Sequence, residues 1–386
     1  MARRLLPRLA RAALVAALGA AFAAFATSAA ADPGVDATHI VIGQSAPLSG
    51  PAAELGRRLR AGILACFAEV NAAGGIDGRR LELITLDDGY EPARTVANTR
   101  QLIGPDAAFA LLGFVGTPTT LAAKPLIDAA QIPLIGPFTG ADALRHPVDP
   151  YVFNLRASYD DETRRIVDAF LFLGLKRVAV FYQDDAYGAA GLSGVRRALA
   201  AHGLLPVATG SVQRNTTAVD AALRTILPAH PDLIVQIGTY AESAAFIDAA
   251  RARGYGGQFA NVSFVGAQSL AQALGTAGDG VMITEVVPFP YSGTRAIQRD
   301  YAQSMKAVGD ATLDFTSFEG YIDARVLVQA LRRAGRVPTR AALIAALDRL
   351  GSDDLGGYVV HFAPDDHDGS HFVDVTSIDS HGGFRH

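Results

Sequence analysis

The sequence of 386 residues contains very little cysteine, methionine and tryptophan: one, three and none, respectively. Because Cys66 has no second cysteine to pair with, the chain forms no intramolecular disulfide. Cys66 falls on the apolar face of a predicted helix, which favours a role in core packing. Burial of apolar side chains, which make up 50% of the sequence, must therefore hold the fold together.

The sequence also lacks the common catalytic motifs. It has no Gly-x-Ser-x-Gly elbow, no His-Glu-x-x-His, no Gly-Lys-Ser/Thr phosphate loop and no Cys-x-x-Cys pair. The stretch 275–280 is rich in glycine but lacks the spacing of a phosphate loop. We therefore predict that the protein is not an enzyme and carries no cofactor. A secreted α/β enzyme remains the less favoured alternative.

One group of side chains has the chemistry of metal ligands. It lies in the stretch HFAPDDHDGSHF and comprises His361, Asp365, Asp366, His367, Asp368 and His371. A hydrated Ca²⁺ or Zn²⁺ site is one interpretation. The stretch also contains turn formers between two strand-like runs, so we predict an ordinary polar turn and no metal.

The first 31 residues have the pattern of a secretory signal peptide. Arg3, Arg4, Arg8 and Arg11 precede an apolar run without any acid, and three alanines ending at Ala31 stand before Asp32. We prefer the general secretory route to a twin-arginine signal, and we predict cleavage near Ala31 and a periplasmic protein. The predicted cleavage site has no cysteine, so we predict no lipid anchor. No later apolar run is long enough to span a bilayer.

The balance of charge is acidic, with 38 Asp and Glu against 34 Lys and Arg and a formal net charge of −4. Loss of the arginine-rich leader makes the mature chain more acidic still. This balance argues against nucleic acid or an anionic membrane as a partner. The 355 residues left after removal of 31 from 386 exceed what one core usually organises, so we expect two lobes.

The stretch 109–140, FALLGFVGTPTTLAAKPLIDAAQIPLIGPFTG, is central to the prediction. It contains an apolar strand at 109–114, a helix beginning at Thr117 and a second apolar strand at 132–135. Such strands belong to a parallel sheet, which binds ligands beyond the carboxyl ends of its strands. Thr117 is predicted either to cap the helix alone or also to hold an anion at the helix terminus. A second turn at 136–140 should lie on the same rim.

Strands and helices alternate along the rest of the mature chain, as in a doubly wound α/β layer. A second series begins after 152–155 and includes strands predicted at 177–181, 233–237, 259–265 and 281–287. The repetition predicts two similar lobes.

Several segments in order resemble type I periplasmic binding proteins of the leucine/isoleucine/valine-binding family, the substrate-binding proteins of branched-chain amino acid ABC transporters. They are PLSGPAAELG, NAAGGIDGRRLELITLDDGYEPARTVANTRQLI, IPLIGPFTGADALR, VFNLRASYDDE, RVAVFYQDDAYG, LIVQIGTYAE, FTSFEGYIDARVLVQAL and LGGYVVHF. The resemblance covers essentially the whole mature chain. It implies an α/β fold of two Rossmann-like lobes with parallel sheets and three hinge crossings, near Arg156, 286–289 and Gly351. Lobe 1 would comprise 32–154 with 288–350, and lobe 2 would comprise 155–287 with 351–386.

The resemblance also implies a ligand-binding site between the lobes. The corresponding residues are Leu55, Tyr90, Phe114, Thr117, Phe138, Thr139, Gly140, Tyr187, Tyr240 and Ser263. Thr117 and the turn 138–140 would hold a carboxylate, with Gly140 where relatives often have a hydroxyl. Tyr187 and Tyr240 would close from lobe 2, or serve only as half-buried packing residues.

The ligand's apolar part would contact Leu55, Tyr90, Phe114 and Phe138, with Phe264 as a further candidate. For Phe114 and Phe138, packing in the lobe core is an equal alternative. Ser263 aligns with the acid that balances an α-ammonium group in relatives, which argues against an α-amino acid ligand because a buried, unpaired ammonium is costly. Glu319 would replace that acid or, as we prefer, brace the hinge.

The sequence therefore predicts an extracytoplasmic receptor that delivers a small carboxylate or amide-type ligand, such as a branched-chain amino acid or a related apolar or aromatic acid, to an ABC importer. Its expected partners are the small-molecule ligand and a membrane ABC permease, with no nucleic acid, and the expected state is a monomer. The alternative with the same fold is a binding protein that docks on a membrane signalling receptor.

Overall fold

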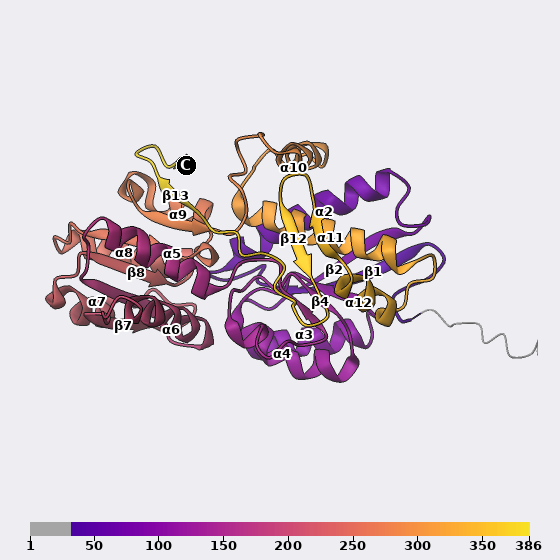
Figure 1. Cartoon of the computed structure of the whole chain (residues 1–386), viewed down its shortest axis with the longest axis horizontal. Coiled ribbons are helices and arrows are strands. Elements are labelled where there is room, and N and C mark those ends of the chain that lie inside the picture. The colour runs from indigo at the N-terminus through magenta and orange to yellow at the C-terminus, as the bar shows by residue number, and fades with distance from the viewer. Residues whose placement is uncertain (1–31) are drawn as a thin grey trace, which may run out of the picture.

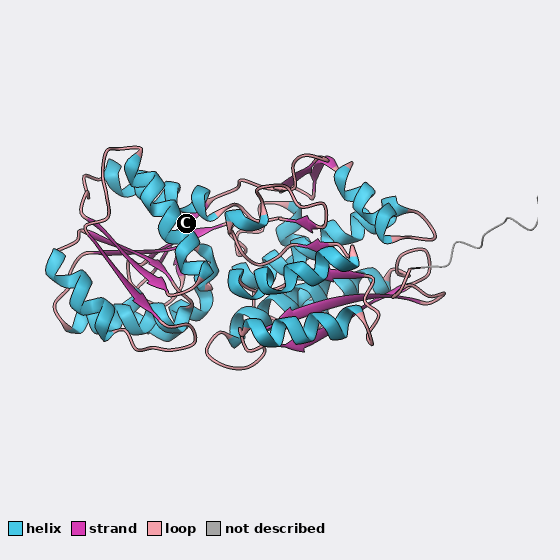
Figure 2. Cartoon of the chain, turned by 90° about the horizontal axis from the view of Figure 1, so that it is seen from below, coloured by secondary structure: helices cyan, strands magenta, loops and turns pink. Residues whose placement is uncertain are grey.

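The computed structural model describes residues 32–386, which form two α/β lobes arranged along the long axis of the molecule (Figure 1). The predicted signal peptide, residues 1–31, lies outside the described residues. Within 32–386, none of the helices combines the length and the apolar character that crossing a membrane requires. Each lobe is a sheet covered by helices (Figure 2).

The first lobe is built on a parallel sheet with the strand order β2-β1-β3-β4-β5. Its strands are β1 (His39–Ala46), β2 (Arg80–Asp87), β3 (Ala110–Leu112), β4 (Leu134–Ile135) and β5 (Val152–Phe153). Its helices are α2 (Ala53–Ala72), α3 (Pro92–Ile103), α4 (Thr117–Ala130), α10 (Ala296–Ala307), α11 (Phe315–Ala334) and α12 (Arg340–Asp348), with the short 3₁₀ turn η1 (Asp142–Leu144).

Strand β3 shows why this sheet is buried on both faces. Ala110 and Leu112 join the large core cluster that includes residues of α2 and α11, whereas Leu111 joins a second cluster with residues of α3 and α4. Because successive strand residues point to opposite faces, a strand that is apolar throughout needs a helical layer on each side. The uninterrupted apolar run in the sequence is therefore explained by this double cover.

The second lobe contains a sheet with the order β14-β13-β10-β9-β8-β6-β7, in which β10 to β7 are parallel and β13 and β14 are antiparallel. Its strands are β6 (Val178–Gln183), β7 (Ala208–Val212), β8 (Leu233–Ile237), β9 (Gln258–Asn261), β10 (Met282–Glu285), β13 (Asp374–Ile378) and β14 (Phe384–Arg385). Its helices are α5 (Tyr159–Phe172), α6 (Ala186–Ala200), α7 (Asp220–Ile226), α8 (Tyr240–Ala252) and α9 (Ala267–Leu274), with 3₁₀ turns η2 (Leu227–Ala229), η3 (Ser263–Val265) and η4 (Gly275–Gly278).

The chain passes between the lobes three times. The first passage lies between β5 and α5, and the second between β10 and α10, at the positions expected from the sequence. The third differs. We expected it near Gly351, but the hairpin of β11 (Gly351–Asp354) and β12 (Val359–Phe362) packs on the first lobe, where Phe362 contacts Phe153 of β5 with ring centroids 5.4 Å apart.

The chain therefore enters the second sheet only at β13, and of the stretch 351–386 only β13 and β14 belong to that sheet (Figure 1). The physical reason is that β12 alternates exposed and buried residues, so the hairpin needs a surface to cover its apolar face. The first lobe provides this surface. Sequence alternation predicts such a strand but not the lobe on which it lies.

Candidate ligand-binding site between the lobes

The two lobes touch each other where the carboxyl ends of their parallel strands face one another. The amide nitrogen of Gln183, at the end of β6, donates to the Tyr90 hydroxyl of the first lobe at 3.4 Å. At the rim of this contact, Arg214 of the second lobe forms an ion pair of 2.9 Å with Glu91. Residues that meet here are called the interlobe site below. This is the edge at which open α/β sheets bind ligands.

On the first lobe, two threonine hydroxyls meet at the interlobe site. The Oγ1 atoms of Thr117 and Thr139 are 2.6 Å apart, and both side chains are buried. The Thr117 hydroxyl does not cap α4, as one reading of the sequence predicted. The N-cap residue is Gly116, whose φ of 99° favours glycine, and Thr117 is already the first helical residue. Its hydroxyl is thus available to the site.

The turn that follows β4 packs closely against the beginning of α5. The backbone N–H of Tyr159 donates to the carbonyl of Gly140 at 2.8 Å. A Cβ at Gly140 would lie 2.7 Å from that nitrogen and 2.8 Å from Cδ1 of the tyrosine ring. A side chain therefore has no room at this position, which explains the glycine where the resemblance led us to expect a hydroxyl residue.

Five aromatic rings, from both lobes, pack together at the interlobe site. Phe264 of η3 lies between the lobes, with ring centroids 4.6 Å from Tyr187, 5.4 Å from Phe138 and 6.0 Å from Tyr90. Tyr159 continues the cluster, at 5.3 Å from Tyr187. All five are buried. Aromatic residues of both lobes thus provide the enclosure that favours an apolar or aryl part of a ligand.

Phe264 reaches the other lobe because β9 is shorter than predicted. The sequence predicted a strand over 259–265, but β9 ends at Asn261 and the chain turns into η3, which contains Ser263. The apolar run continues past Asn261 because these residues are buried between the lobes. The spacing of apolar residues in the sequence does not distinguish such a buried turn from a buried strand.

Leu55 and Tyr240 lie together at another part of the lobe contact. A Cβ built on Gly266 would be 2.6 Å from Cδ2 of Leu55 and 3.9 Å from the Tyr240 ring, so both side chains pack on this glycine. The Tyr240 hydroxyl lies 3.5 Å from the backbone nitrogen of Glu54, near the beginning of α2. Tyr240 thus spans the two lobes.

Phe114 does not join the interlobe site. Its side chain belongs to the smaller core cluster of the first lobe, with Leu111 and with residues of α3 and α4. Its backbone carbonyl still accepts the N–H of Phe138 at 2.8 Å, so the residue supports the turn 138–140 through its main chain. The structure therefore places Phe114 in the core of the first lobe, whereas Phe138 belongs to the large core cluster and packs against Phe264 of the second lobe.

Arg156, in the first passage between the lobes, is a charged residue of the interlobe site that the sequence did not single out as a ligand contact. It is fully buried, and its guanidinium carbon lies 4.4 Å from the centre of the Phe138 ring. Its Nη2 donates to the hydroxyl of Ser263, and its Nε forms an ion pair of 3.3 Å with Glu319. Ser263, at the position where relatives have an acid, is therefore bound to a cation.

Buried carboxyl groups surround this arginine. Glu319 and Asp323 come from α11, Glu162 from α5 and Glu285 from β10. Burial raises the pKa of each carboxyl above its usual value, and the positive charge of Arg156 opposes this effect at all four. Because four acids share one guanidinium, its charge does not offset burial at any of them, and the pKa of Glu319 is raised to about 7.

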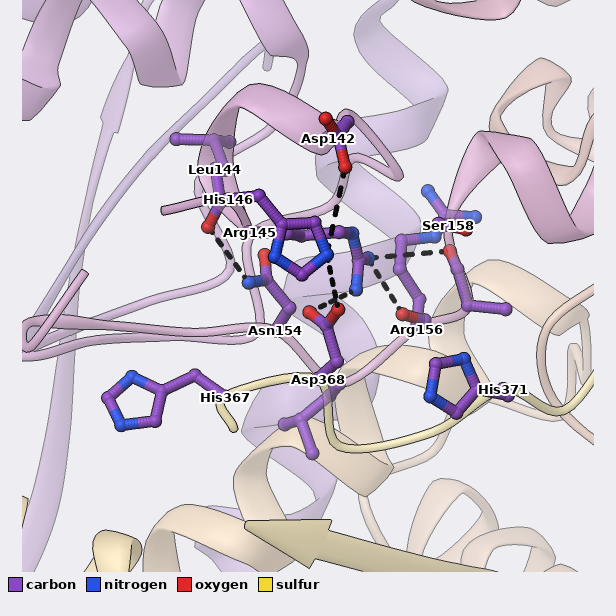
Figure 3. Close-up of polar contacts among 12 residues, drawn as sticks. Asp142, Leu144, Arg145, His146, Asn154, Arg156, Ser158, His367, Asp368 and His371 are labelled. Carbon is purple, nitrogen blue, oxygen red and sulfur yellow. Dashed lines mark hydrogen bonds and ion pairs between the residues drawn. The ribbon is translucent and has the colours of Figure 1, made fainter. Parts of the chain in front are cut away.

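The backbone of the first passage is held by a hydrogen bond from Arg145 (Figure 3). Its Nη2 donates to the carbonyl of Arg156 at 2.8 Å, and its Nη1 forms an ion pair of 2.7 Å with Asp368 of the third passage. The guanidinium of Arg145 therefore ties two of the three passages together, and it holds the main chain from which the Arg156 side chain extends.

The acidic and histidine side chains of the turn 361–371 contact different partners. His367 stacks on Phe153 with ring centroids 4.0 Å apart, and His371 lies 3.1 Å from Asp161 at the beginning of α5. Within residues 32–386, no three His, Cys, Asp or Glu side chains are grouped as metal ligands. The side chains of this turn thus contact the first passage and its neighbours, as Figure 3 shows for Asp368.

Sequence reasoning missed Arg156 and Tyr159 as site residues, although both lie in the quoted segment VFNLRASYDDE. A signal was present, because Arg156 stands in the first predicted hinge crossing. A charged residue beside a predicted ligand site is a candidate contact, but the sequence does not tell whether its side chain turns inward.

Comparison with known proteins agrees with this architecture. A family model described as "Periplasmic binding protein" matches residues 39–383. The structure of a possible leucine/isoleucine/valine-binding protein from Rhodopirellula baltica SH 1 is 39% identical, with a TM-score of 0.86, over 90% of this chain and 95% of that chain.

Two further relatives extend the comparison. A substrate-binding periplasmic protein from Ralstonia solanacearum is 35% identical, with a TM-score of 0.85, over 89% of this chain and 99% of that one. Leu/Ile/Val-binding protein homolog 7 of Brucella melitensis biotype 1 (strain 16M) is 24% identical over 90% of each chain.

Two α/β lobes that meet at the carboxyl ends of their strands define a two-lobed solute-binding protein. The chain belongs to the periplasmic binding protein family, in its branched-chain amino acid binding group. Proteins of this family bind small molecules, work with ABC transporters and are generally not enzymes, and membership implies an extracytoplasmic location.

Proposed function

We propose that this protein captures a small carboxylate or amide-type ligand with an apolar or aromatic part and delivers it to an ABC importer in the membrane. The observation that carries this proposal is the meeting of the Thr117 and Thr139 hydroxyls with the aromatic cluster around Phe264 in one buried site. Hydroxyl groups hydrogen-bond a polar head, and the rings enclose an apolar tail. The names of the relatives support branched-chain amino acids or similar acids as the ligand class.

Capture requires the lobes to separate and close again. The aromatic rings of the site are buried between the lobes, so a ligand reaches them only when the second lobe moves away. The three passages provide the hinge for such a motion. In this mechanism the first lobe receives the polar head at Thr117 and the turn 138–140, and then Tyr187 and Tyr240 close over the ligand. The importer would recognise the closed form of a monomer.

A thermal-shift screen with a transport assay tests this proposal. The protein would be heated with amino acids, aliphatic and aromatic carboxylates, and amides. A ligand at a hundred times its dissociation constant adds about 2.7 kcal/mol to the free energy of unfolding, which gives a measurable rise in melting temperature. We expect the response to weaken in Thr117→Val, whereas Thr225→Val, which changes an exposed threonine of α7, should respond as the wild type does.

Uptake of the identified ligand by cells with and without this protein tests delivery. We expect uptake at low ligand concentration to depend on the protein. Binding without dependent uptake would contradict delivery and would favour the sensory alternative. The absence of a shift with every class of compound would contradict the proposed ligand class itself.

A further inference from the structure

Two hydrogen-bond donors at the interlobe site have no partner among the described residues. One is Nη1 of Arg156; Nε of the same guanidinium also makes no hydrogen bond, but it has the ion pair with Glu319. The other is the hydroxyl of Tyr159, which lies near Thr139 and the backbone N–H of Gly140 but makes no hydrogen bond of acceptable geometry. Both side chains are fully buried. Nearly all buried polar atoms in proteins are hydrogen-bonded, so two orphan donors in one place require an explanation.

The side chains of Arg156 and Tyr159 both contact the turn 138–140. The Arg156 guanidinium lies over the Phe138 ring, and Tyr159 is hydrogen-bonded to the carbonyl of Gly140. Next to them is the Thr117–Thr139 hydroxyl pair. Donors from three segments of the chain thus converge on the place where the ligand's polar head is expected, which is the arrangement that holds an oxygen-rich anion.

A purely structural role accounts for only part of Arg156. Its Nε faces Glu319 and its Nη2 binds Ser263, which braces the hinge between the lobes. This leaves Nη1 without a protein acceptor. A guanidinium and a carboxylate match in geometry and form two parallel hydrogen bonds, so a ligand carboxylate is the natural partner.

We propose that Arg156 binds the carboxylate of the ligand, with Tyr159 as a second donor, and that the protein therefore selects carboxylic acids without an α-ammonium group. An α-ammonium lies next to its own carboxylate, so it would be held close to the guanidinium, where like charges repel. Ser263 offers no negative charge there, and its hydroxyl is already bound by Arg156. This inference rests on the proposed function and narrows its ligand class.

Two of the carboxyl groups near Arg156 have partners in the protein. Glu162 accepts the backbone N–H of Ser263 and the hydroxyl of Thr284, each at 2.7 Å. Glu319 faces Nε of the arginine, while Asp323 packs against Gly136, where a Cβ would lie 2.4 Å from its carboxyl carbon. Glu162 and Glu285 each keep one oxygen without a partner and Asp323 keeps both, so one of these three acids would receive an ammonium if the proposal were wrong.

Calorimetric titration of the full protein with matched compounds tests the proposal. The pairs are 4-methylpentanoate with leucine and 3-phenylpropanoate with phenylalanine, and each acid is also compared with its neutral amide. We expect the acids to bind at least about tenfold more tightly than the amino acids. Removal of one member of a buried charge pair typically costs a factor of about 30 or more, so we expect Arg156→Met to weaken acid binding to that extent.

Three further variants keep the result interpretable. Arg156→Lys retains the charge without the two parallel donors, so it should bind acids with intermediate affinity. Tyr159→Phe removes only the second donor and should weaken acid binding about fivefold to tenfold. Arg58→Met is the matched control, because Arg58 lies in a separate ion-pair cluster, and it should bind acids as the wild type does.

The outcomes separate this inference from the proposed function. Amino acids that bind as tightly as the matched acids, with their binding lost in Glu162→Gln, Glu285→Gln or Asp323→Asn, would overturn the inference and leave the proposed function intact. Acid binding by Arg156→Met within threefold of the wild type would overturn it as well. If no compound of any class binds, both fail. Should Arg156→Met not fold, the comparison of acids with amino acids on the wild type still decides.

Discussion

Two arginines in different regions of the molecule show what distinguishes a structural cation from one that serves a ligand. Arg58 of α2 faces the beginning of α11, where its Nε binds Asp314 at 2.6 Å, its Nη1 binds Asp310 at 2.7 Å and its Nη2 binds the Thr312 carbonyl at 2.6 Å. Every nitrogen of this guanidinium has a protein acceptor. Arg156 is more deeply buried, yet two of its nitrogens, Nε and Nη1, make no hydrogen bond among the described residues, and Nη1 has no ion pair either.

Two acids, one beside each arginine, have pKa values that are shifted in opposite directions. At Asp310, burial raises the pKa, but the Thr312 backbone N–H and the Arg58 guanidinium outweigh it, so the pKa is lowered. At Glu319, burial outweighs Arg156, and the pKa is raised to about 7. The Arg58 cluster is thus a set of matched charges, whereas the Arg156 cluster has more acids than its cation can balance. The raised pKa of Glu319 lets this cluster take up a proton, and the unpartnered Nη1 of Arg156 is where an anionic ligand can bind.

The largest effect on stability is expected at the complete cluster. Arg58→Met leaves Asp310 and the nearly buried Asp314 without a cation, and we expect a loss of about 3 kcal/mol in the free energy of unfolding. Arg156→Met should cost less at pH 6, because its neighbouring acids, including Glu319, can take up protons. Urea denaturation of both variants measures this. A greater loss for Arg156→Met at pH 6 would contradict the distinction between the clusters.

The second prediction concerns the threonine pair and the tyrosine beside it. Thr139→Val leaves the buried Thr117 hydroxyl without its 2.6 Å partner, and we expect a loss of about 1–3 kcal/mol. Tyr159→Phe removes a hydroxyl that has no hydrogen bond, so stability should stay within about 0.5 kcal/mol of the wild type. Thermal unfolding without ligand measures both variants. Equal losses would show that the Tyr159 hydroxyl has a protein partner after all.

The third prediction concerns pH. The folded protein holds the Glu319 proton more tightly than the unfolded chain does, so this group's contribution to stability is full at acidic pH and is lost as pH rises toward about 7. Glu319→Gln should therefore flatten the decline of melting temperature between pH 5 and pH 8. A change in the opposite direction would mean that Glu319 is ionised in the folded protein at pH 5.

The same carboxyl group should couple ligand binding to protons. A ligand carboxylate beside Arg156 repels ionised Glu319, so binding should be up to about tenfold tighter at pH 6 than at pH 8. Glu319→Gln should reduce this difference in affinity. It should not abolish the difference, because Glu162, Glu285 and Asp323 can still take up protons. Titrations at both pH values, in buffers of different ionisation enthalpy, measure the affinity and the proton uptake. An affinity that does not change with pH would show that Glu319 is not coupled to the ligand.

The sequence by itself determined the α/β architecture, the two lobes and the family. Apolar strands that alternate with amphipathic helices permit few other arrangements, and the strand–turn–helix order places Thr117 and the turn 138–140 on one rim. These are local properties, because the spacing of apolar residues, the turn residues and the order of the elements can all be read from residues that are close together in the sequence.

Only the tertiary structure decided which side chains meet between the lobes. Phe114 and Phe138 have the same chemistry and both follow apolar strands, but one packs in the core of the first lobe and the other lies beneath Arg156. The third passage lies in the segment before β13, and not near Gly351 as we expected, for a similar reason: the apolar face of the β11–β12 hairpin is covered by the first lobe. Contacts between residues far apart in the chain depend on side-chain direction and on lobe packing, and neither is encoded in any short stretch of the sequence.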